Sequence, residues 1–354
     1  MSTPPQPPGY PPQGSYPGPY APPPLQKPSA LPLEPVEYQH VLRGPRYAPW
    51  RPLVSLLLVI AGVAIATIAI LILAMIGYVG ASRGDLGPIE EMALDLDNPI
   101  TFGVQNLWLA ALIPVAMLAT WAAHGVRPGF VSSVLGRFRW GWFGWCLLLI
   151  TPIWLSYVIG ATLVVEGSLG DTAGRPSTWV VLLVLTLLTT PLQAAGEEYV
   201  FRGWLMQQIG AYIKHTYVAL ALAVVISATL FALAHASLDP WILLDLGAFA
   251  TAAVLLTWRT GGLEAAVALH IVNNVIVLIL SVLTTGIGSA IITSETTSSP
   301  GTTLLSVAVL ALTTAALWWL AGRRDISRRT TPPALPPAGG WEQVSGAAWS
   351  GRGA

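Results

Sequence analysis

The fourth apolar stretch of the chain, residues 179–206, has the sequence WVVLLVLTLLTTPLQAAGEEYVFRGWLM. It is longer than the roughly 20 apolar residues that an α-helix needs to cross the hydrocarbon core of a bilayer. Close to its end it carries two adjacent carboxylates and a guanidinium, at Glu197, Glu198 and Arg202. An ionisable group at membrane depth costs about 2.5–3.5 kcal/mol on insertion scales, so such groups are usually paired or functional. The stretch therefore predicts a membrane-spanning helix that carries a site.

The rest of the chain has the composition of a membrane protein. Its 354 residues are 54% hydrophobic and 10% charged, with a mean hydropathy of +0.64, which is too little polar surface to enclose a soluble core. The formal net charge is zero, so we expect no nucleic-acid partner. The single cysteine, Cys146, excludes an internal disulfide and a cysteine metal site.

Eight stretches approach the length of a membrane span, which predicts an all-α, polytopic fold with about eight transmembrane helices and a lipid bilayer as its surroundings. These stretches are residues 53–79, 104–123, 142–165, 179–206, 217–236, 241–258, 263–283 and 303–321. We find no internal repeat of the kind seen in inverted-repeat transporters.

The basic residues predict the orientation, because Lys and Arg near the spans favour the cytoplasmic side. With the N-terminus inside, Arg83 and Arg175 fall outside, Arg202 lies within a span, and all other basic residues fall inside. Those on the inside are Lys27, Arg43, Arg46, Arg51, Arg127, Arg137, Arg139, Lys214, Arg259, Arg323, Arg324, Arg328, Arg329 and Arg352. We therefore expect a multi-pass protein of the cell membrane with both termini in the cytoplasm.

Both ends of the chain differ in composition from the membrane domain, which we place at residues 51–323. Residues 1–50 contain sixteen prolines, and residues 324–354 are rich in Pro, Gly and Ser. Such compositions bury too little apolar surface to offset the entropy of ordering, so we expect two disordered cytoplasmic tails.

Two further apolar stretches carry polar residues, His235 in the sequence FALAHA and His270 with Asn274 in LHIVNN. Residues four apart share a helix face, so His270 and Asn274 point into the same space. A carboxylate, two imidazoles and an amide away from bulk water are suited to activating a water molecule and stabilising an oxyanion.

The two adjacent glutamates predict different roles. Glu198 and Arg202 are four residues apart, in the order that favours an ion pair, and we expect this pair to support the site. Glu197 is rotated by about 100° from Glu198 and lacks that partner, which makes it the candidate for a free base.

Three short motifs now stand in order on successive apolar segments: EExxxR at 197–202, FxxxH at 231–235 and HxxxN at 270–274. They resemble the motifs of the CPBP family, the CaaX proteases and bacteriocin-processing enzymes, to which the Ras-converting CaaX endopeptidase belongs. The resemblance covers residues 179–283 and implies an eight-helix intramembrane peptidase that acts on a membrane-associated or prenylated peptide. It also implies that Glu197 and His235 activate water, and that His270 and Asn274 form the oxyanion site.

Several alternatives stay open at this stage. Members of the family have been described both as metalloproteases and as glutamate-dependent hydrolases, and a zinc ion held by Glu197, His235 and His270 would leave a fourth position for water. The sequence has no HExxH motif, and we favour the metal-free base. A non-proteolytic membrane scaffold or immunity-type protein, or a transporter with a proton relay, would use the same fold differently. Asn273 is expected to pack between helices, and Asp245 to be accessible to water or to orient His235.

The expected boundaries place Glu197 low in the fourth span and His235 high in the fifth, so that straight helices would keep them apart. We therefore expect either a break or displacement of the fourth helix near Pro191, or a shift or tilt of the fifth helix.

Overall fold

The computed structural model describes residues 28–331 of the 354, apart from residues 86, 88, 169–171 and 236. Within these residues the protein is an all-α bundle in which eight helical stretches are long and apolar enough to cross a membrane. The predicted fold class, an all-α multi-pass membrane protein with eight spans, is confirmed.

The helices follow one another as α1 (Arg51–Ala81), α2 (Ile89–Leu94), α3 (Pro99–Ala110), α4 (Leu112–His124), α5 (Gly129–Ser132), α6 (Trp140–Glu166), α7 (Trp179–Glu198), η3 (Tyr199–Leu205), α8 (Met206–Tyr212), α9 (Thr216–Ala234), α10 (Pro240–Thr260), α11 (Glu264–Thr284) and α12 (Pro300–Arg323). Short 3₁₀ turns occur at η1 (Tyr38–His40), η2 (Thr172–Gly174) and η4 (Ile287–Ala290).

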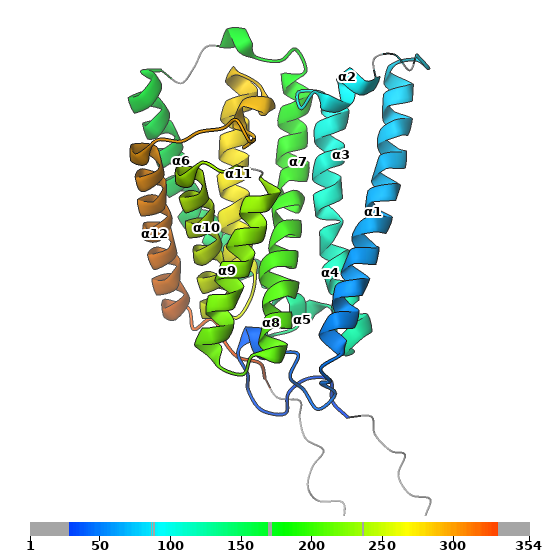
Figure 1. Cartoon of the computed structure of the whole chain (residues 1–354). Coiled ribbons are helices and arrows are strands. Elements are labelled where there is room, and N and C mark those ends of the chain that lie inside the picture. Colours follow the sequence, from blue (N-terminus) through cyan, green and yellow to red (C-terminus); the bar gives the residue numbers. More distant parts are fainter. Residues whose placement is uncertain (1–27, 86, 88, 169–171, 236, 332–354) are drawn as a thin grey trace, which may run out of the picture.

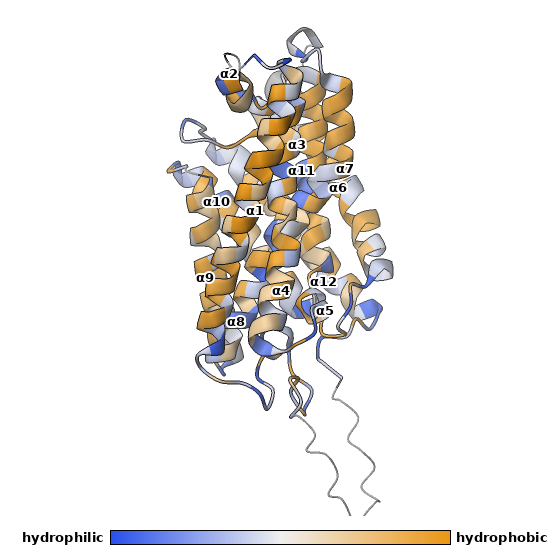
Figure 2. Cartoon of the chain, turned by 90° about the vertical axis from the view of Figure 1, so that its right-hand side faces the viewer, coloured by the Kyte–Doolittle hydropathy of each residue, from blue (hydrophilic) through white to orange (hydrophobic). Residues whose placement is uncertain are grey.

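The most buried helices of the bundle are α10 and α11. Helix α11 packs against α6, α7 and α10, and α10 packs against α9, α11 and α12 (Figure 1). Half of the residues in the most apolar part of α10 and of α11 are buried. The corresponding share for α1 is 6%, so nearly all of its surface faces outward. Figure 2 shows hydrophobic residues along the length of the helices and hydrophilic residues at their ends. An outer surface of this kind is suited to contact with lipid.

The fourth span is longer than predicted and contains an irregular turn. It runs through α7, the π-helical segment η3 and α8, from Trp179 to Tyr212, well past the predicted end at residue 206. The helix continues through Pro191, so the irregularity is not at the proline but at Tyr199–Leu205, directly after the two glutamates. A π-helical turn within an α-helix frequently marks a functional site.

A single residue allows α7 to approach α3 closely beside the glutamates. A Cβ atom built on Gly196 would lie 1.9 Å from the carbonyl oxygen of Leu109, which no real side chain permits. Glycine at this position therefore sets how closely the backbone of α7 packs against the second span at the level of Glu197.

We name the end of the bundle that carries both described chain ends the terminal face; it comprises residues 28–50, 125–139, 213–215, 261–263 and 324–331. Residues 28–50 pack against it rather than forming part of a disordered tail. Tyr38 is fully buried and donates a hydrogen bond to the carbonyl oxygen of Val131, and Val41 is also fully buried. The prediction of disorder is thus wrong for residues 28–50, because the apolar residues Val36, Tyr38, Val41 and Leu42 follow the proline-rich part and supply a buried surface.

The C-terminal segment joins the same packing, so the predicted disorder is also wrong for residues 324–331. The backbone N–H of Thr330 donates to the carbonyl oxygen of Val36 at 2.9 Å, and Arg328 forms an ion pair with Glu37 at 2.7 Å. The remainder of the two predicted tails, residues 1–27 and 332–354, lies outside the described residues.

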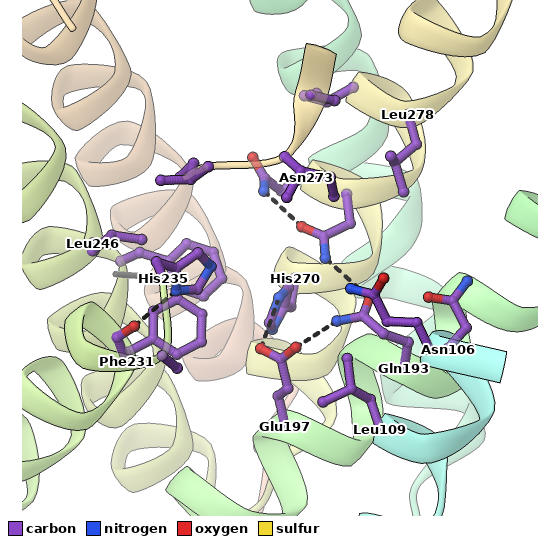
Figure 3. A pocket seen from close by; sticks show the side chains of 18 of the residues that line it. Asn106, Leu109, Gln193, Glu197, Phe231, His235, Leu246, His270, Asn273 and Leu278 are labelled. Carbon is purple, nitrogen blue, oxygen red and sulfur yellow. Dashed lines mark hydrogen bonds and ion pairs between the residues drawn. The ribbon is translucent and has the colours of Figure 1, made fainter. Parts of the chain in front are cut away.

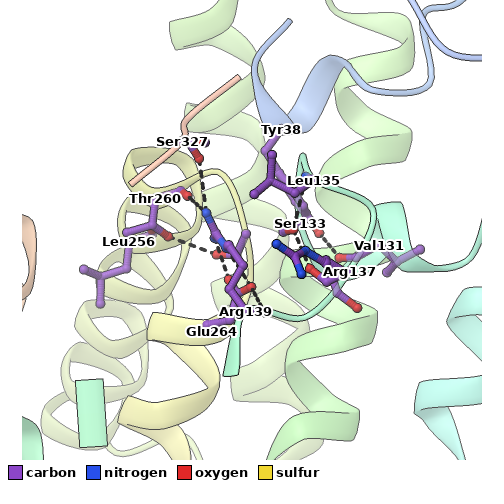
Figure 4. Close-up of polar contacts among 12 residues, drawn as sticks. Tyr38, Val131, Ser133, Leu135, Arg137, Arg139, Leu256, Thr260, Glu264 and Ser327 are labelled. Atoms are coloured by element: carbon purple, nitrogen blue, oxygen red, sulfur yellow. Dashed lines mark hydrogen bonds and ion pairs between the residues drawn. The ribbon is translucent and has the colours of Figure 1, made fainter. Parts of the chain in front are cut away.

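A buried ion pair joins the ends of three helices at the terminal face (Figure 4). The guanidinium of Arg139, just before α6, donates to both carboxylate oxygens of Glu264 at the start of α11, at 2.8 and 2.6 Å. The same guanidinium donates to the carbonyl oxygens of Thr260 at the end of α10 and Ser327 in the C-terminal segment. Bidentate Arg–carboxylate pairs of this type fix geometry as well as contributing energy.

Candidate active site

The extended fourth span brings Glu197 and His235 to similar depths in the bundle. At about 1.5 Å per residue, Glu197 lies roughly 22 Å along the helix from Tyr212, and His235 lies roughly 28 Å along α9 from Thr216. Both distances start from the same turn at the terminal face, which connects α8 to α9. The conflict expected from the sequence came from ending the fourth span too early.

A cavity of about 670 Å³ lies among α3, α7, α9, α10, α11 and α12. Its lining includes all four residues predicted to be catalytic: Glu197, His235, His270 and Asn274. Figure 3 shows Glu197 and His270 pointing toward one another, and His235 on the α9 wall beside Phe231. The three motifs therefore meet at one place within the apolar bundle.

Glu198 and Arg202 lie behind the wall of this cavity and form the predicted ion pair. The Nη1 of Arg202 lies 2.9 Å from Oε1 of Glu198, and both side chains are fully buried. The guanidinium also lies 5.4–5.9 Å from the ring centroids of Phe201, Phe231 and Phe249. The rings supply cation–π attraction to a charge that is far from water.

The residue that Glu198 contacts in the cavity is His270. The Nδ1 of His270 lies 2.8 Å from Oε1 of Glu198, so the pair of Glu198 and Arg202 contacts the site through His270. An ionised carboxylate can only accept, so this contact places a proton on Nδ1. The ion pair therefore fixes both the orientation and the tautomer of the imidazole.

Glu197 itself is held by one hydrogen bond and faces His270 with its other oxygen. Its Oε1 accepts from Nε2 of Gln193 at 2.5 Å, and its Oε2 lies 3.7 Å from Nε2 of His270. A distance of 3.7 Å is too long for a direct hydrogen bond. A small molecule in the cavity could therefore form hydrogen bonds to Oε2 of Glu197 and Nε2 of His270 at the same time.

His235 ends α9 and is fixed by its own helix. Its Nδ1 lies 2.7 Å from the carbonyl oxygen of Phe231, which can only accept, so Nδ1 carries the proton and the neutral ring keeps a lone pair on Nε2. This atom is the one through which His235 can accept from water or coordinate a metal.

The three residues proposed as zinc ligands share the cavity but are not grouped around one point. Within the described part of the chain, no three His, Cys, Asp or Glu side chains stand close enough to hold a metal ion. Zinc ligands lie about 2.0–2.2 Å from the metal. Glu197, His235 and His270 do not form such a group as they are arranged in the described part of the chain.

Gln193, which was not among the predicted site residues, lies one turn before Glu197 on α7 and is buried. Its Oε1 accepts from Nδ2 of Asn274 at 3.1 Å, and Oδ1 of Asn274 accepts from Nδ2 of Asn273 at 2.9 Å. The signal was present, because an amide four residues before a glutamate shares its helix face. Asn273, expected only to pack between helices, is bonded to a site residue.

Asp245, on α10, lines the same cavity. Ser306, on α12, lines it as well. The alternative that Asp245 orients His235 gains no support from this arrangement, because the ring of His235 is held by Phe231.

Comparisons with known proteins agree with the geometry over this part of the chain. Residues 176–276 match a family model described as type II CAAX prenyl endopeptidase Rce1-like. A search of curated proteins and a search of solved structures found no significant match. The matched region contains α7, η3, α8, α9, α10 and the part of α11 that carries His270 and Asn274. Residues 176–276 are thus similar to the Rce1-like type II CAAX prenyl endopeptidases, which confirms the resemblance to the CPBP family drawn from the three motifs.

Proposed function

We propose that this chain is an intramembrane endopeptidase that hydrolyses a peptide bond of a membrane-associated protein or peptide. One observation carries the proposal: residues from three separate motifs, on α7, at the end of α9 and on α11, line a single cavity in an apolar bundle. A scaffold or immunity-type protein would need no such set of a base and hydrogen-bond donors, and the family match favours a hydrolase.

In the proposed reaction Glu197 is the general base. Its Oε2 takes a proton from a water molecule that also donates to Nε2 of His235, and the resulting hydroxide attacks the carbonyl carbon of the scissile bond. As the C–N bond breaks, Glu197 returns the proton to the leaving nitrogen. Water is thereby added across the bond, and the enzyme ends in its starting protonation state.

His270 and Asn274 are the proposed donors to the oxyanion. To donate to the oxyanion, His270 carries a proton on Nε2 as well as on Nδ1, and its Nε2–H then points toward the space beside Glu197. Asn274 donates one amide hydrogen to Gln193, and its second amide hydrogen is free to bind the oxyanion. Such donors act most strongly where bulk water is excluded.

We also propose a class of substrate and a location for this protein. The match to CAAX prenyl endopeptidases supports a membrane-associated substrate, with prenylated peptides as the first class to test. The many arginines near the terminal face support the proposal that this face lies on the cytoplasmic side and that the protein spans the cell membrane.

The test uses the full chain purified in detergent and a library of peptides with and without a prenyl group. We expect cleavage by the unsubstituted protein and none by Glu197→Gln, with Asp245→Asn as a control that changes a second carboxylate of the same cavity and leaves most of the activity. Metal content is measured on the same samples. Equal turnover by Glu197→Gln would remove Glu197 as the base, and stoichiometric zinc that is required for turnover would replace the metal-free reaction.

A further inference from the structure

A chain of three amides ends on the carboxylate of Glu197, and we infer that this chain positions Glu197 for catalysis through Gln193. The contacts run from Asn273 to Asn274 at 2.9 Å, from Asn274 to Gln193 at 3.1 Å, and from Gln193 to Glu197 at 2.5 Å (Figure 3). We call Asn273, Asn274 and Gln193 the amide relay. The inference rests on the proposed function and adds positioning residues to the same site.

The carboxylate at its end fixes the direction of the whole relay. An ionised carboxylate has no proton to donate, so Gln193 presents its amide nitrogen to Glu197 and turns its oxygen away. That oxygen must accept, which obliges Asn274 to present its nitrogen to Gln193. The oxygen of Asn274 then faces Asn273, which donates in turn. Each amide has one orientation that satisfies its neighbours.

The relay holds Glu197 without pairing it with a positive charge. Its last bond occupies Oε1, which leaves Oε2 turned toward His270 and the cavity. Glu198, one residue further on, is instead paired with the guanidinium of Arg202 and fully buried. A general base needs a free lone pair in a defined place, and a neutral donor on its second oxygen supplies the orientation while the charge stays available.

A purely structural role for the same bonds has a different signature. Hydrogen bonds between α11 and α7 could serve only to join two helices in the membrane. Losing them would then lower the melting temperature while the turnover of the folded protein stayed the same. A positioning role lowers kcat with little change in KM, because the substrate still enters the same cavity.

The first test removes the donor next to Glu197. Gln193→Leu keeps much of the volume and removes the hydrogen bond, and misplacement of a catalytic group should lower kcat by roughly 10²-fold with KM nearly unchanged. The matched control is Asn106→Leu. Asn106 is a buried amide on another wall of the same cavity, but it donates to the hydroxyls of Thr189 and Thr190 on α7, outside the relay. Its loss should leave kcat close to that of the unsubstituted protein.

The second test changes the direction of the hydrogen bonds in the relay and leaves Gln193 itself unchanged. In Asn273→Asp the new carboxylate can only accept, so Asn274 must turn its nitrogen toward residue 273, and the orientation of Gln193 is no longer satisfied. Asn273→Ala removes the same donor without imposing the opposite direction. We therefore expect a clearly lower kcat for Asn273→Asp than for Asn273→Ala, with both proteins folded.

The outcomes separate this inference from the proposed function. If the unsubstituted protein cleaves peptides and Glu197→Gln does not, the proposed function stands. The positioning role is then overturned if Gln193→Leu matches Asn106→Leu in kcat, or, where Gln193→Leu does not fold, if Asn273→Asp and Asn273→Ala have the same kcat. If no peptide is cleaved by any sample, the proposed function and the positioning role fall together.

Discussion

The imidazole of His270 and the carboxylate of Glu198 lie 2.8 Å apart, although they stand on different helices and 72 residues apart in the chain. The same carboxylate binds Arg202, so a buried guanidinium, a carboxylate and an imidazole form one continuous set of contacts that reaches the cavity. Glu198 therefore links the buried guanidinium of Arg202 to the imidazole of His270 in the cavity.

Glu198→Gln should reduce stability and turnover together. The substitution leaves Arg202 as a buried charge with no ionised partner, which costs about 3–5 kcal/mol where the pair is fully buried. It also replaces a carboxylate, which can only accept, by an amide whose nitrogen donates, so a proton on Nδ1 of His270 is no longer imposed. We expect a lower melting temperature in detergent and, in the fraction that stays folded, a reduced kcat. Unchanged melting would show that Arg202 finds compensation elsewhere, and unchanged turnover of the folded variant would contradict the orienting role.

Glu197→Gln and His235→Ala should cost nearly the same amount of turnover, because both residues are assigned to one water molecule. Residues that act as a unit are strongly non-additive, so the double variant should be little worse than either single variant. Steady-state kinetics on the three variants measure this directly. Losses that multiply would indicate that the two residues serve separate steps.

Asn274→Ala should lower kcat by about a hundred- to a thousandfold with a modest change in KM, the typical effect of losing one preorganised oxyanion donor. The structure gives this variant a second effect, because Asn274 also binds Gln193. His270→Ala should be at least as severe without loss of bound metal. If the protein binds zinc, and His270→Ala releases it while Asn274→Ala retains it, a metal site replaces the oxyanion assignment of His270.

Acid should weaken the attachment of the N-terminal segment through Glu37. Burial raises the pKa of Glu37, but the combined effect of its partners is larger and places the pKa below the ordinary value of 4.5; these partners are Trp258, Gln39, Arg328 and Thr216. For an acid with a lowered pKa, the stabilisation is fully present above the unfolded value and is lost as the pH falls through the folded value. The melting temperature should therefore drop as the pH is lowered below about 4.5, and this drop should be smaller in Glu37→Gln, which should already melt lower near neutral pH.

The number and approximate position of the spans followed from the sequence because a run of apolar residues has few alternatives in a bilayer. The pair of Glu198 and Arg202 followed from helix periodicity in the same way. The end of the fourth helix did not, because residues 207–212 are only weakly apolar and hydropathy does not distinguish a helix that extends beyond the membrane from a loop. The contact between Glu198 and His270 depends on how two helices rotate against each other, which no local pattern encodes.

The packing of the two described end segments, residues 28–50 and 324–331, could not be predicted from local composition either. Proline content predicted disorder through residue 50, yet a short cluster of apolar residues within that range suffices for burial once a surface is available to receive it. That surface belongs to distant parts of the chain, such as Val131, and is invisible in the local composition.

The hydrogen bond between Thr330 and Val36 has a consequence for biosynthesis. The two residues are 294 positions apart, and Val36 leaves the ribosome long before its partner is made. Tyr38 can dock on Val131 early in synthesis, but Val36 gains its partner only after all eight spans have been made, so the packing of the terminal face is completed late. A chain that stalls before residue 330 would carry a complete cavity but lack the contacts of the C-terminal segment, so nascent chains of increasing length should gain the last part of their protease resistance at residues 28–50 only when residue 330 has been added.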